Sequence, residues 1–185
     1  RLAGLHPLEA EDHDDTFQGA FDSLGVQRGI TECGAGHNSQ IGRVAELAFK
    51  NCTVTRITKD DDLASVYGFN KSLNSIKGPF HLLYSSIPCK GGSTLSYVNW
   101  SRGNKETRRK IMLARFEFRR LFRRIVMLAV HARAVGAKIA LEWPARCIYW
   151  KIRAVLVFLR IFGLKKVNFD GCAVGLKSIA RATQG

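Results

Sequence analysis

The sequence lacks an apolar run that is both long enough and free enough of charge to cross a bilayer. No signal-peptide pattern follows Arg1, and we expect a fragment or an excised domain. Internal repeats and low-complexity tracts are also missing, so a repeat architecture is not expected. With 185 residues and 46% hydrophobic residues, the chain can form one globular domain with its own core.

Cysteine pairs are missing as well. The five cysteines are odd in number and scattered, and none forms a CxxC pair: Cys33, Cys52, Cys89, Cys147 and Cys172. This pattern argues against a disulfide framework and against a zinc knuckle. It predicts a metal-free protein in a reducing, intracellular setting, either nuclear or cytoplasmic.

Acidic residues are few. The chain has 29 basic against 15 acidic residues, a net charge of +14, which favours nucleic acid as a partner and an anionic membrane surface second. The charge is uneven, since residues 1–27 are acidic while residues 101–124 hold ten bases and two acids. The densest basic cluster is Arg119, Arg120, Arg123 and Arg124. A solvated helix face explains such a run about equally well, and a membrane-surface helix is a third option.

Strand and helix patterns alternate along the rest of the chain. Strands are expected at 29–32, 52–58, 79–86, 138–142 and 165–169. Helices are expected from Ser39 as the N-cap through residue 48, and at 63–76, 105–135 and 152–162. The alternation predicts an α/β domain with a mostly parallel sheet and right-handed crossovers. We expect it to span residues 29–185, C-terminally incomplete, with residues 1–28 as an acidic lead-in outside the core.

Two patterns follow the first two strands. Glu32-x-Gly34-x-Gly36 ends a strand and opens a helix, so backbone amides there can approach a ligand closely. A purely structural turn is about as reasonable an interpretation as a cofactor loop. Asp60, Asp61 and Asp62 end the next strand, where an acid can accept hydrogen bonds from a ribose. A solvated acidic turn accounts for at least two of the three.

Cys89 and Glu142 follow two later strands and are expected to converge on one pocket. A thiolate nucleophile needs nearby positive charge, which Lys90 can supply, and residues 90–93 are expected to form a flexible loop able to close over a base. The alternative for Cys89 is a small buried residue. Glu142 is expected beside a buried strand and a tryptophan, as a tuned carboxyl or as the partner of an arginine.

In this order, Glu32-Cys-Gly34-Ala-Gly36, Pro88-Cys89 and Glu142-Trp-Pro resemble the core of the DNA methyltransferases that form 5-methylcytosine. The resemblance covers roughly residues 29–175 and implies a Rossmann-like, doubly wound fold of the class I methyltransferase type with S-adenosylmethionine as cofactor. It implies that Cys89 attacks carbon 6 of cytosine and that Glu142 holds and protonates the ring. It implies cofactor contacts from Glu32, Gly34, Gly36, Asn38, Pro88 and one of Asp60 and Asp61.

The sequence departs from the family in several places. Glu142 is followed by Trp-Pro instead of Asn-Val, and His81 stands where the family often has aspartate. The strand between the acidic turn and the Pro-Cys strand is missing or shortened, Gly175 is a weak match to a later glycine loop, and Arg181 only faintly echoes the family's arginine segment. A target-recognition domain has no room after Gly175. The resemblance is therefore to a divergent or truncated member, of the kind that a mobile element carries.

Three hypotheses follow. The first is methylation of a cytosine in nucleic acid, DNA more than RNA. The second is a catalytically inactive module that binds nucleic acid through the basic helix, with contacts from Lys90 and the four clustered arginines. The third is a small-molecule methyltransferase in which Cys89 is incidental.

Overall fold

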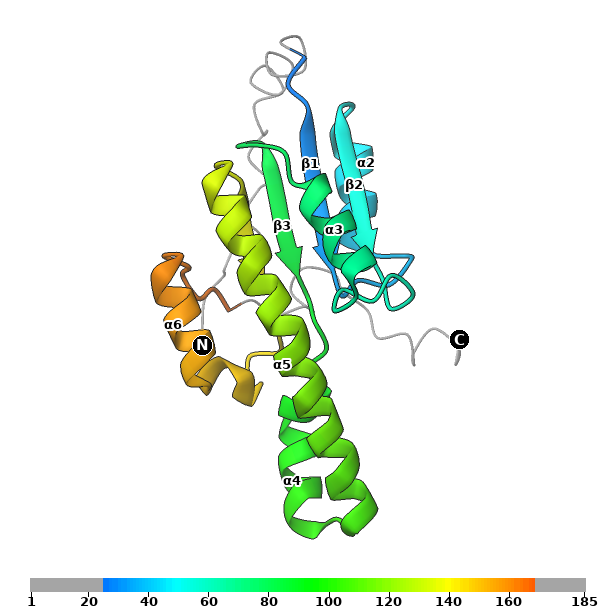
Figure 1. Cartoon of the computed structure of the whole chain (residues 1–185), viewed down its shortest axis with the longest axis vertical. Helices are drawn as coiled ribbons and strands as arrows, with labels where there is room; N and C mark the ends of the chain where they lie inside the picture. Colours follow the sequence, from blue (N-terminus) through cyan, green and yellow to red (C-terminus); the bar gives the residue numbers. More distant parts are fainter. Residues whose placement is uncertain (1–24, 169–185) are drawn as a thin grey trace, which may run out of the picture. The chain divides into compact units, whose positions relative to one another are not determined.

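The computed structural model describes residues 25–168 (Figure 1). These residues belong to two compact units, each described here by itself. The sheet unit contains residues 25–88 and 119–142, and the helical unit contains residues 89–118 and 143–168. The predicted acidic lead-in lies mostly outside the described residues, as do Cys172, Gly175 and Arg181.

The sheet unit contains four strands that are all parallel, which confirms the predicted α/β class and parallel sheet. The strands are β1 (Arg28–Cys33), β2 (Cys52–Ile57), β3 (His81–Ser85) and β4 (Lys138–Leu141). Their order in the sheet is β2-β1-β3-β4, so the chain builds outward from β1 first on one side and then on the other. The loops that leave β1 and β3 therefore diverge, and such a point is where open α/β sheets place their ligands.

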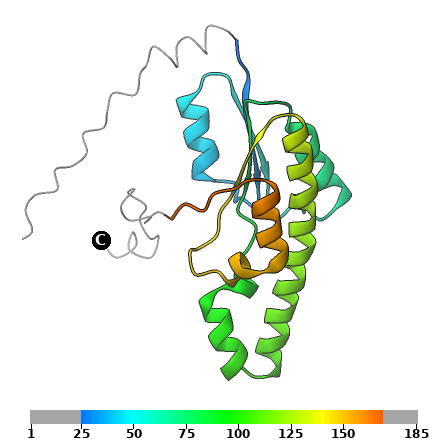
Figure 2. The ribbon, with the colours of Figure 1, turned by 90° about the vertical axis from the view of Figure 1, so that its left-hand side faces the viewer.

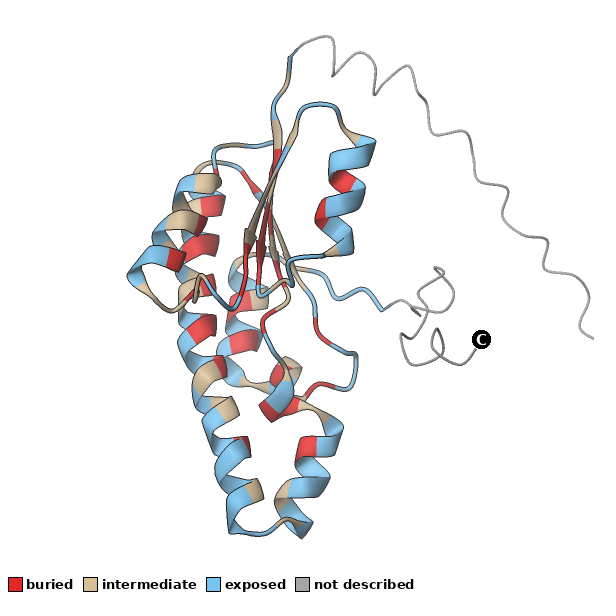
Figure 3. Ribbon diagram, turned by 90° about the vertical axis from the view of Figure 1, so that its right-hand side faces the viewer, coloured by how far each residue is buried: buried red, intermediate tan, exposed pale blue. Residues whose placement is uncertain are grey.

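Helices cover both faces of this sheet. Figure 2 shows α2 (Gln40–Ala48) on one face, and α3 (Val66–Ser75) with the second half of α5 (Lys105–Ala134) on the other. The part of α5 in the sheet unit buries the apolar stripe expected from its spacing, which the red bands in Figure 3 trace along the helix: Leu121, Phe122, Ile125, Leu128, Ala129 and Ala132. Gly136 adopts φ +80° and ends α5 as predicted.

The helical unit contains α4 (Thr94–Arg102), the first half of α5 and α6 (Arg153–Ile161), together with two short 3-10 turns, η1 (Lys90–Gly92) and η2 (Ile148–Lys151). Its core is aromatic: the rings of Phe118 and Tyr149 stack at 3.7 Å, and Trp143 meets Phe118 edge-on at 5.7 Å. Helix α4 was not expected from the sequence. Ser93 caps it, because its hydroxyl accepts a hydrogen bond from the Ser96 amide at 3.1 Å.

Residues 90–93 do not form the flexible loop that the sequence suggested. Gly91 and Gly92 are buried in η1, and a Cβ on either one would lie 2.6 Å from an atom of the Tyr149 side chain. Arg115 also donates from Nε to the Gly91 carbonyl at 3.1 Å. The glycines are needed for close packing, so the expectation of a loop that closes over a base was wrong.

The prediction of a strand at 165–169 is also wrong for the four of these residues that the structure describes. Residues 165–168 carry no strand and are exposed, and Phe169 lies outside the described residues. Gly163, at φ +64°, closes α6 as predicted. Within residues 25–168, no helix combines the length and the apolar character needed to cross a membrane.

A buried polar cluster joins β1, β3 and α3 on the face that α3 covers. The Thr31 hydroxyl lies 2.8 Å from His81 Nε2 and 2.6 Å from the Ser75 hydroxyl. A Cβ on Gly29 would meet the His81 ring at 2.2 Å, so the ring is packed tightly against β1. Burial lowers the pKa of His81, and the charge of Lys77 lowers it further. His81 is therefore a neutral structural residue at the amino end of β3.

This cluster predicts that stability depends on the protonation of His81. Because its folded pKa is below the unfolded value of 6.5, the unfolded chain takes up a proton first as the pH falls. The contribution of His81 to the free energy of unfolding should be fully present above pH 6.5. It should decrease as the pH falls from 6.5 toward the folded pKa. Urea denaturation between pH 7.5 and 5.0 measures this. His81→Gln should lose most of the slope, while His37→Gln, at an exposed site, should keep it; an unchanged slope in His81→Gln contradicts the assignment.

Candidate functional site

The sheet unit has a cavity of about 480 Å³ at the carboxyl ends of β1, β3 and β4. Its volume is within the range of roughly 300–1,000 Å³ that small-molecule sites occupy. It lies where the strand order reverses, beside β1 and β3. The lining consists of residues 34–39 and Ile41 after β1, Tyr84 and Ser86 from β3 and its exit, and Glu142 after β4.

The two predicted loop glycines have different roles. Gly34 adopts φ +83°, and a Cβ there would lie 2.9 Å from the Ile87 Cα. Gly34 is thus required by the fold, both for its backbone angle and for the approach of the chain that leaves β3. Gly36 has an ordinary φ, and a Cβ there would meet no atom within 4 Å. The fold leaves room at Gly36, on the lining of the cavity, where a ligand can approach the backbone.

Glu32 is completely buried beneath this loop and does not line the cavity. Its carboxylate accepts a hydrogen bond from the Ser39 hydroxyl at 2.5 Å and forms an ion pair with Arg56 Nε at 3.3 Å. The hydroxyl of Ser39 is therefore used by Glu32 and not to cap α2. Gly42 packs against the same pair, since a Cβ there would lie 2.6 Å from Glu32 Oε2. Glu32 fixes the position of the glycine loop from below.

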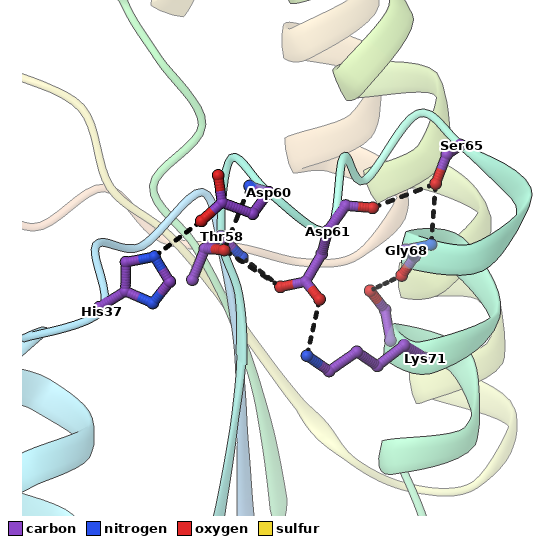
Figure 4. A network of polar contacts seen from close by, with 8 residues as sticks. His37, Thr58, Asp60, Asp61, Ser65, Gly68 and Lys71 are labelled. Atoms are coloured by element: carbon purple, nitrogen blue, oxygen red, sulfur yellow. Dashed lines mark hydrogen bonds and ion pairs between the residues drawn. The ribbon is translucent and has the colours of Figure 1, made fainter.

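The acids after β2 also separate into different roles, as Figure 4 shows. Asp61 accepts hydrogen bonds from the Thr58 amide at 2.9 Å and from Lys71 Nζ at 2.8 Å. Burial alone would raise the pKa of Asp61, but the hydrogen bonds from Lys71 and Thr58 and the charge of Lys71 lower it overall. Asp60 is exposed and lies 2.9 Å from His37 Nε2, a residue of the glycine loop. Asp60 is thus the acid that remains available beside the cavity, while Asp61 stabilises the turn.

Glu142 is exposed at the cavity. The expectation that this carboxylate would lose hydration beside a buried strand is therefore wrong. Its Oε2 accepts a hydrogen bond from the Tyr84 hydroxyl at 2.9 Å. Burial raises the pKa of Tyr84, and the hydrogen bond and charge of Glu142 raise it further, so Tyr84 stays a neutral donor. No arginine forms an ion pair with Glu142 among the described residues.

Among residues 25–168, the cavity lining contains no lysine and no arginine, although the protein carries a net charge of +14. Within this described lining, the one carboxylate is Glu142 and the one histidine is His37. Across residues 25–168, no group of three or more histidine, cysteine or acidic side chains is arranged to hold a metal ion. The cavity therefore attracts positive charge and gives phosphate groups no basic partner.

Cys89 belongs to the helical unit, and Pro88 is the last residue of the first sheet-unit segment. Cys89 is half-buried and immediately precedes η1, with its carbonyl accepting from the Gly92 amide at 2.8 Å. Lys90 is exposed, and its carbonyl accepts a hydrogen bond from the Ser96 hydroxyl. Pro88 is exposed and does not line the cavity. The convergence of Cys89 with Glu142 stays a prediction.

The four clustered arginines of α5 differ in their contacts: two bond residues at or before the start of α3, and two are exposed. Arg120 pairs with Asp62 at 3.2 Å, and Arg124 donates to the Ala64 carbonyl at 3.2 Å while its guanidinium lies 4.7 Å from the centre of the Phe69 ring. These two arginines attach α5 to the start of α3. Arg119 and Arg123 are exposed. Half of the predicted nucleic-acid cluster thus has a structural role inside the sheet unit.

Sequence reasoning did not identify Tyr84, Ser86 or His37 as lining residues. The signal for Tyr84 and Ser86 is their alternation along β3, which places both on the face opposite the buried Leu83 and Ser85. The signal for His37 is its position inside the glycine loop. These three residues can be recognised as lining residues only once the ends of β1 and β3 are known to be neighbours.

In comparisons with known proteins, no family model, no curated protein and no solved structure matches this chain. The function is therefore argued from the geometry of the cavity and from the residues around it.

Proposed function

We propose that this chain is an S-adenosylmethionine-dependent methyltransferase that acts on a cytosine in nucleic acid, DNA more than RNA. The observation that carries the proposal is the cavity at the point where the strand order reverses, which combines a glycine loop with a carboxylate and has no basic side chain among its described lining residues. The Rossmann-like fold of the class I methyltransferase type is part of the same proposal. It is supported by the parallel sheet with helices on both faces.

The charge of the cavity supports this cofactor over the phosphate-bearing ones. Dinucleotides and nucleoside triphosphates carry phosphates, which glycine loops at helix N-termini bind through backbone amides and which lysine or arginine often stabilises further. The described lining residues supply neither basic side chain. S-adenosylmethionine carries no phosphate, and its sulfonium and ammonium groups are positive. Glu142 attracts such groups, and its hydrogen bond from Tyr84 fixes one carboxylate oxygen.

The residues around the cavity fit the parts of this cofactor. Gly36 leaves its backbone open to a ligand, and Asn38 on the same loop offers an amide. Asp60, joined to His37, is placed at the end of β2 where an acid can accept hydrogen bonds from ribose hydroxyls. When bound, the cofactor supplies an electrophilic methyl group. Glu32 and Asp61 support the site from outside the cavity by fixing the loops, while Gly34 lines the cavity and is required by the fold.

The proposed chemistry uses Cys89 and Glu142. The Cys89 thiolate forms a bond to carbon 6 of a cytosine taken out of the stack. Glu142, which takes up a proton when the cytosine binds, holds the amidine edge and passes that proton to the ring nitrogen. The electron pair displaced from the 5,6 double bond makes carbon 5 nucleophilic toward the methyl group that the cofactor would supply, which would leave S-adenosylhomocysteine. Loss of the carbon 5 proton to water, departure of the Cys89 thiolate and return of the ring-nitrogen proton to Glu142 restore the ring.

Cofactor binding is tested by blocking the open space at Gly36. Gly36→Trp should abolish S-adenosylmethionine binding measured by calorimetry, because the indole fills the cavity. Gly78→Trp is a matched control, since a Cβ at Gly78 would also meet no atom within 4 Å and Gly78 does not line the cavity. Equal binding by both variants shows that the cofactor does not use this cavity. No binding by the wild-type protein rules out this cofactor and leaves an inactive nucleic-acid-binding module.

The nucleophile is tested with an oligonucleotide that carries 5-fluorocytosine, which traps the attacked base because fluorine cannot leave as a proton does. Wild-type protein with cofactor should form a covalent adduct that denaturing electrophoresis detects. Cys89→Ser should lose the adduct completely, and Glu142→Gln should slow its formation by at least about 100-fold. Cys52→Ser, a half-exposed control in the sheet unit, should trap the base normally. An adduct that survives in Cys89→Ser refutes the assignment.

A further inference from the structure

The last part of the helical unit has no acidic residue. Residues 143–168, called the acid-free segment below, carry six basic side chains. All six are exposed: Arg146, Lys151, Arg153, Arg160, Lys165 and Lys166. Sequence reasoning placed the nucleic-acid contacts on α5, because it looked for density of charge and not for the absence of counter-charge.

These bases have no carboxylate partner among residues 25–168. Lys166 instead contacts an aromatic ring, with its Nζ 5.9 Å from the centre of the Trp150 ring. In α5 of the same unit, by contrast, Glu106 lies 3.8 Å from both Arg109 and Lys110. Within the described residues, the acid-free segment therefore carries positive charge that no carboxylate compensates, and a polyanion can bind to it.

Helix α6 places two of these basic residues on the same side of the helix. Val155 and Phe158 are buried and anchor one side of the helix in the helical unit. Arg153 and Arg160 are seven residues apart, which is about two turns and about 10 Å along the axis, so both lie on the same exposed side. Lys151 precedes the helix and Lys165 follows it, which extends the positive charge beyond both ends.

We infer that the acid-free segment is the surface that contacts the phosphate backbone of nucleic acid. The biological setting of this inference rests on the proposed function, but the surface itself is argued from charge and exposure. The segment is better suited than the arginine cluster of α5, because Arg120 and Arg124 already serve contacts within the sheet unit. Phosphate contacts of this kind fix position and carry no sequence information.

An anionic membrane is the competing partner, since Leu156, Val157 and Ile161 are also exposed on α6. The helix has only nine residues, and its other side is used by the core of the helical unit. Four of the six bases lie outside α6, before and after it, instead of forming the polar side of one interfacial helix. This distribution favours an extended polyanion.

The test compares two variants that each lose four positive charges. One replaces Lys151, Arg153, Arg160 and Lys165 by glutamine. The matched control replaces four exposed bases of the sheet unit by glutamine: Arg43, Lys50, Lys59 and Lys77. Binding to a fluorescent 20-base-pair duplex is measured by anisotropy between 50 and 300 mM salt without cofactor. The log–log salt slope of the first variant should be shallower by about 3 to 4, at about 0.9 per contact, and that of the control by less than about 1.

Equal slopes in the two variants show that net charge alone drives binding and overturn the inference, as does a wild-type protein that does not bind the duplex at 50 mM salt. Stronger binding of the wild type to phosphatidylserine vesicles than to DNA, lost in the first variant, assigns the surface to membranes instead. Circular dichroism verifies the fold of both variants. Because no cofactor is present, this result is independent of cofactor binding and of the Cys89 adduct, which test the proposed function separately.

Discussion

The cavity depends on the close approach of Gly34 to the chain that leaves β3. A Cβ at position 34 would lie 2.9 Å from the Ile87 Cα, and the backbone there adopts φ +83°. The Ser86 amide donates to the Cys33 carbonyl at 2.9 Å, so the pairing of β1 with β3 continues past the end of the strands. The next residues of the two chains then diverge, and their divergence opens the cavity. A side chain at Gly34 would separate the two strands at the point where the site is formed.

The buried ion pair beneath the glycine loop gives that loop its position. Glu32 Oε2 and Arg56 Nε are 3.3 Å apart, and both of these atoms are buried. The Nη atoms of Arg56, which is partly exposed, also donate to the exposed Glu46 at 3.4 Å. Such a pair contributes little net stability, because desolvation of both groups opposes their attraction. Its value here is positional, since Ser39 at the start of α2 is bonded to the same carboxylate. The loop that offers Gly36 to a ligand is thereby tied to β1 at one end and to α2 at the other.

Local pattern was enough to predict four strands, the long helix and the parallel sheet, because these depend on the spacing of apolar residues. It was not enough where a role depends on a distant partner. Gly91 and Gly92 were interpreted as a flexible loop, since nothing nearby in sequence indicates that Tyr149 packs on them. Asp60 and Asp61 are adjacent and have the same side chain. Their roles differ because Asp61 bonds Thr58 and Lys71, whereas Asp60 bonds His37. Glu142 was predicted as a site residue, but its exposure and its hydrogen bond from Tyr84 follow from strand pairing.

We propose that the cavity selects a positively charged nucleoside, because Glu142 is the one carboxylate and no lysine or arginine is present among the lining residues that the structure describes. The most direct measurement is the calorimetric affinity of the wild-type protein and Glu142→Gln for S-adenosylmethionine, for S-adenosylhomocysteine, which lacks the sulfonium charge, and for ATP. The account predicts that ATP binds at least about 10-fold more weakly than S-adenosylmethionine, and that Glu142→Gln weakens S-adenosylmethionine several-fold more than S-adenosylhomocysteine. ATP binding as tight as that of S-adenosylmethionine, or equal losses for both adenosyl ligands in Glu142→Gln, would contradict it.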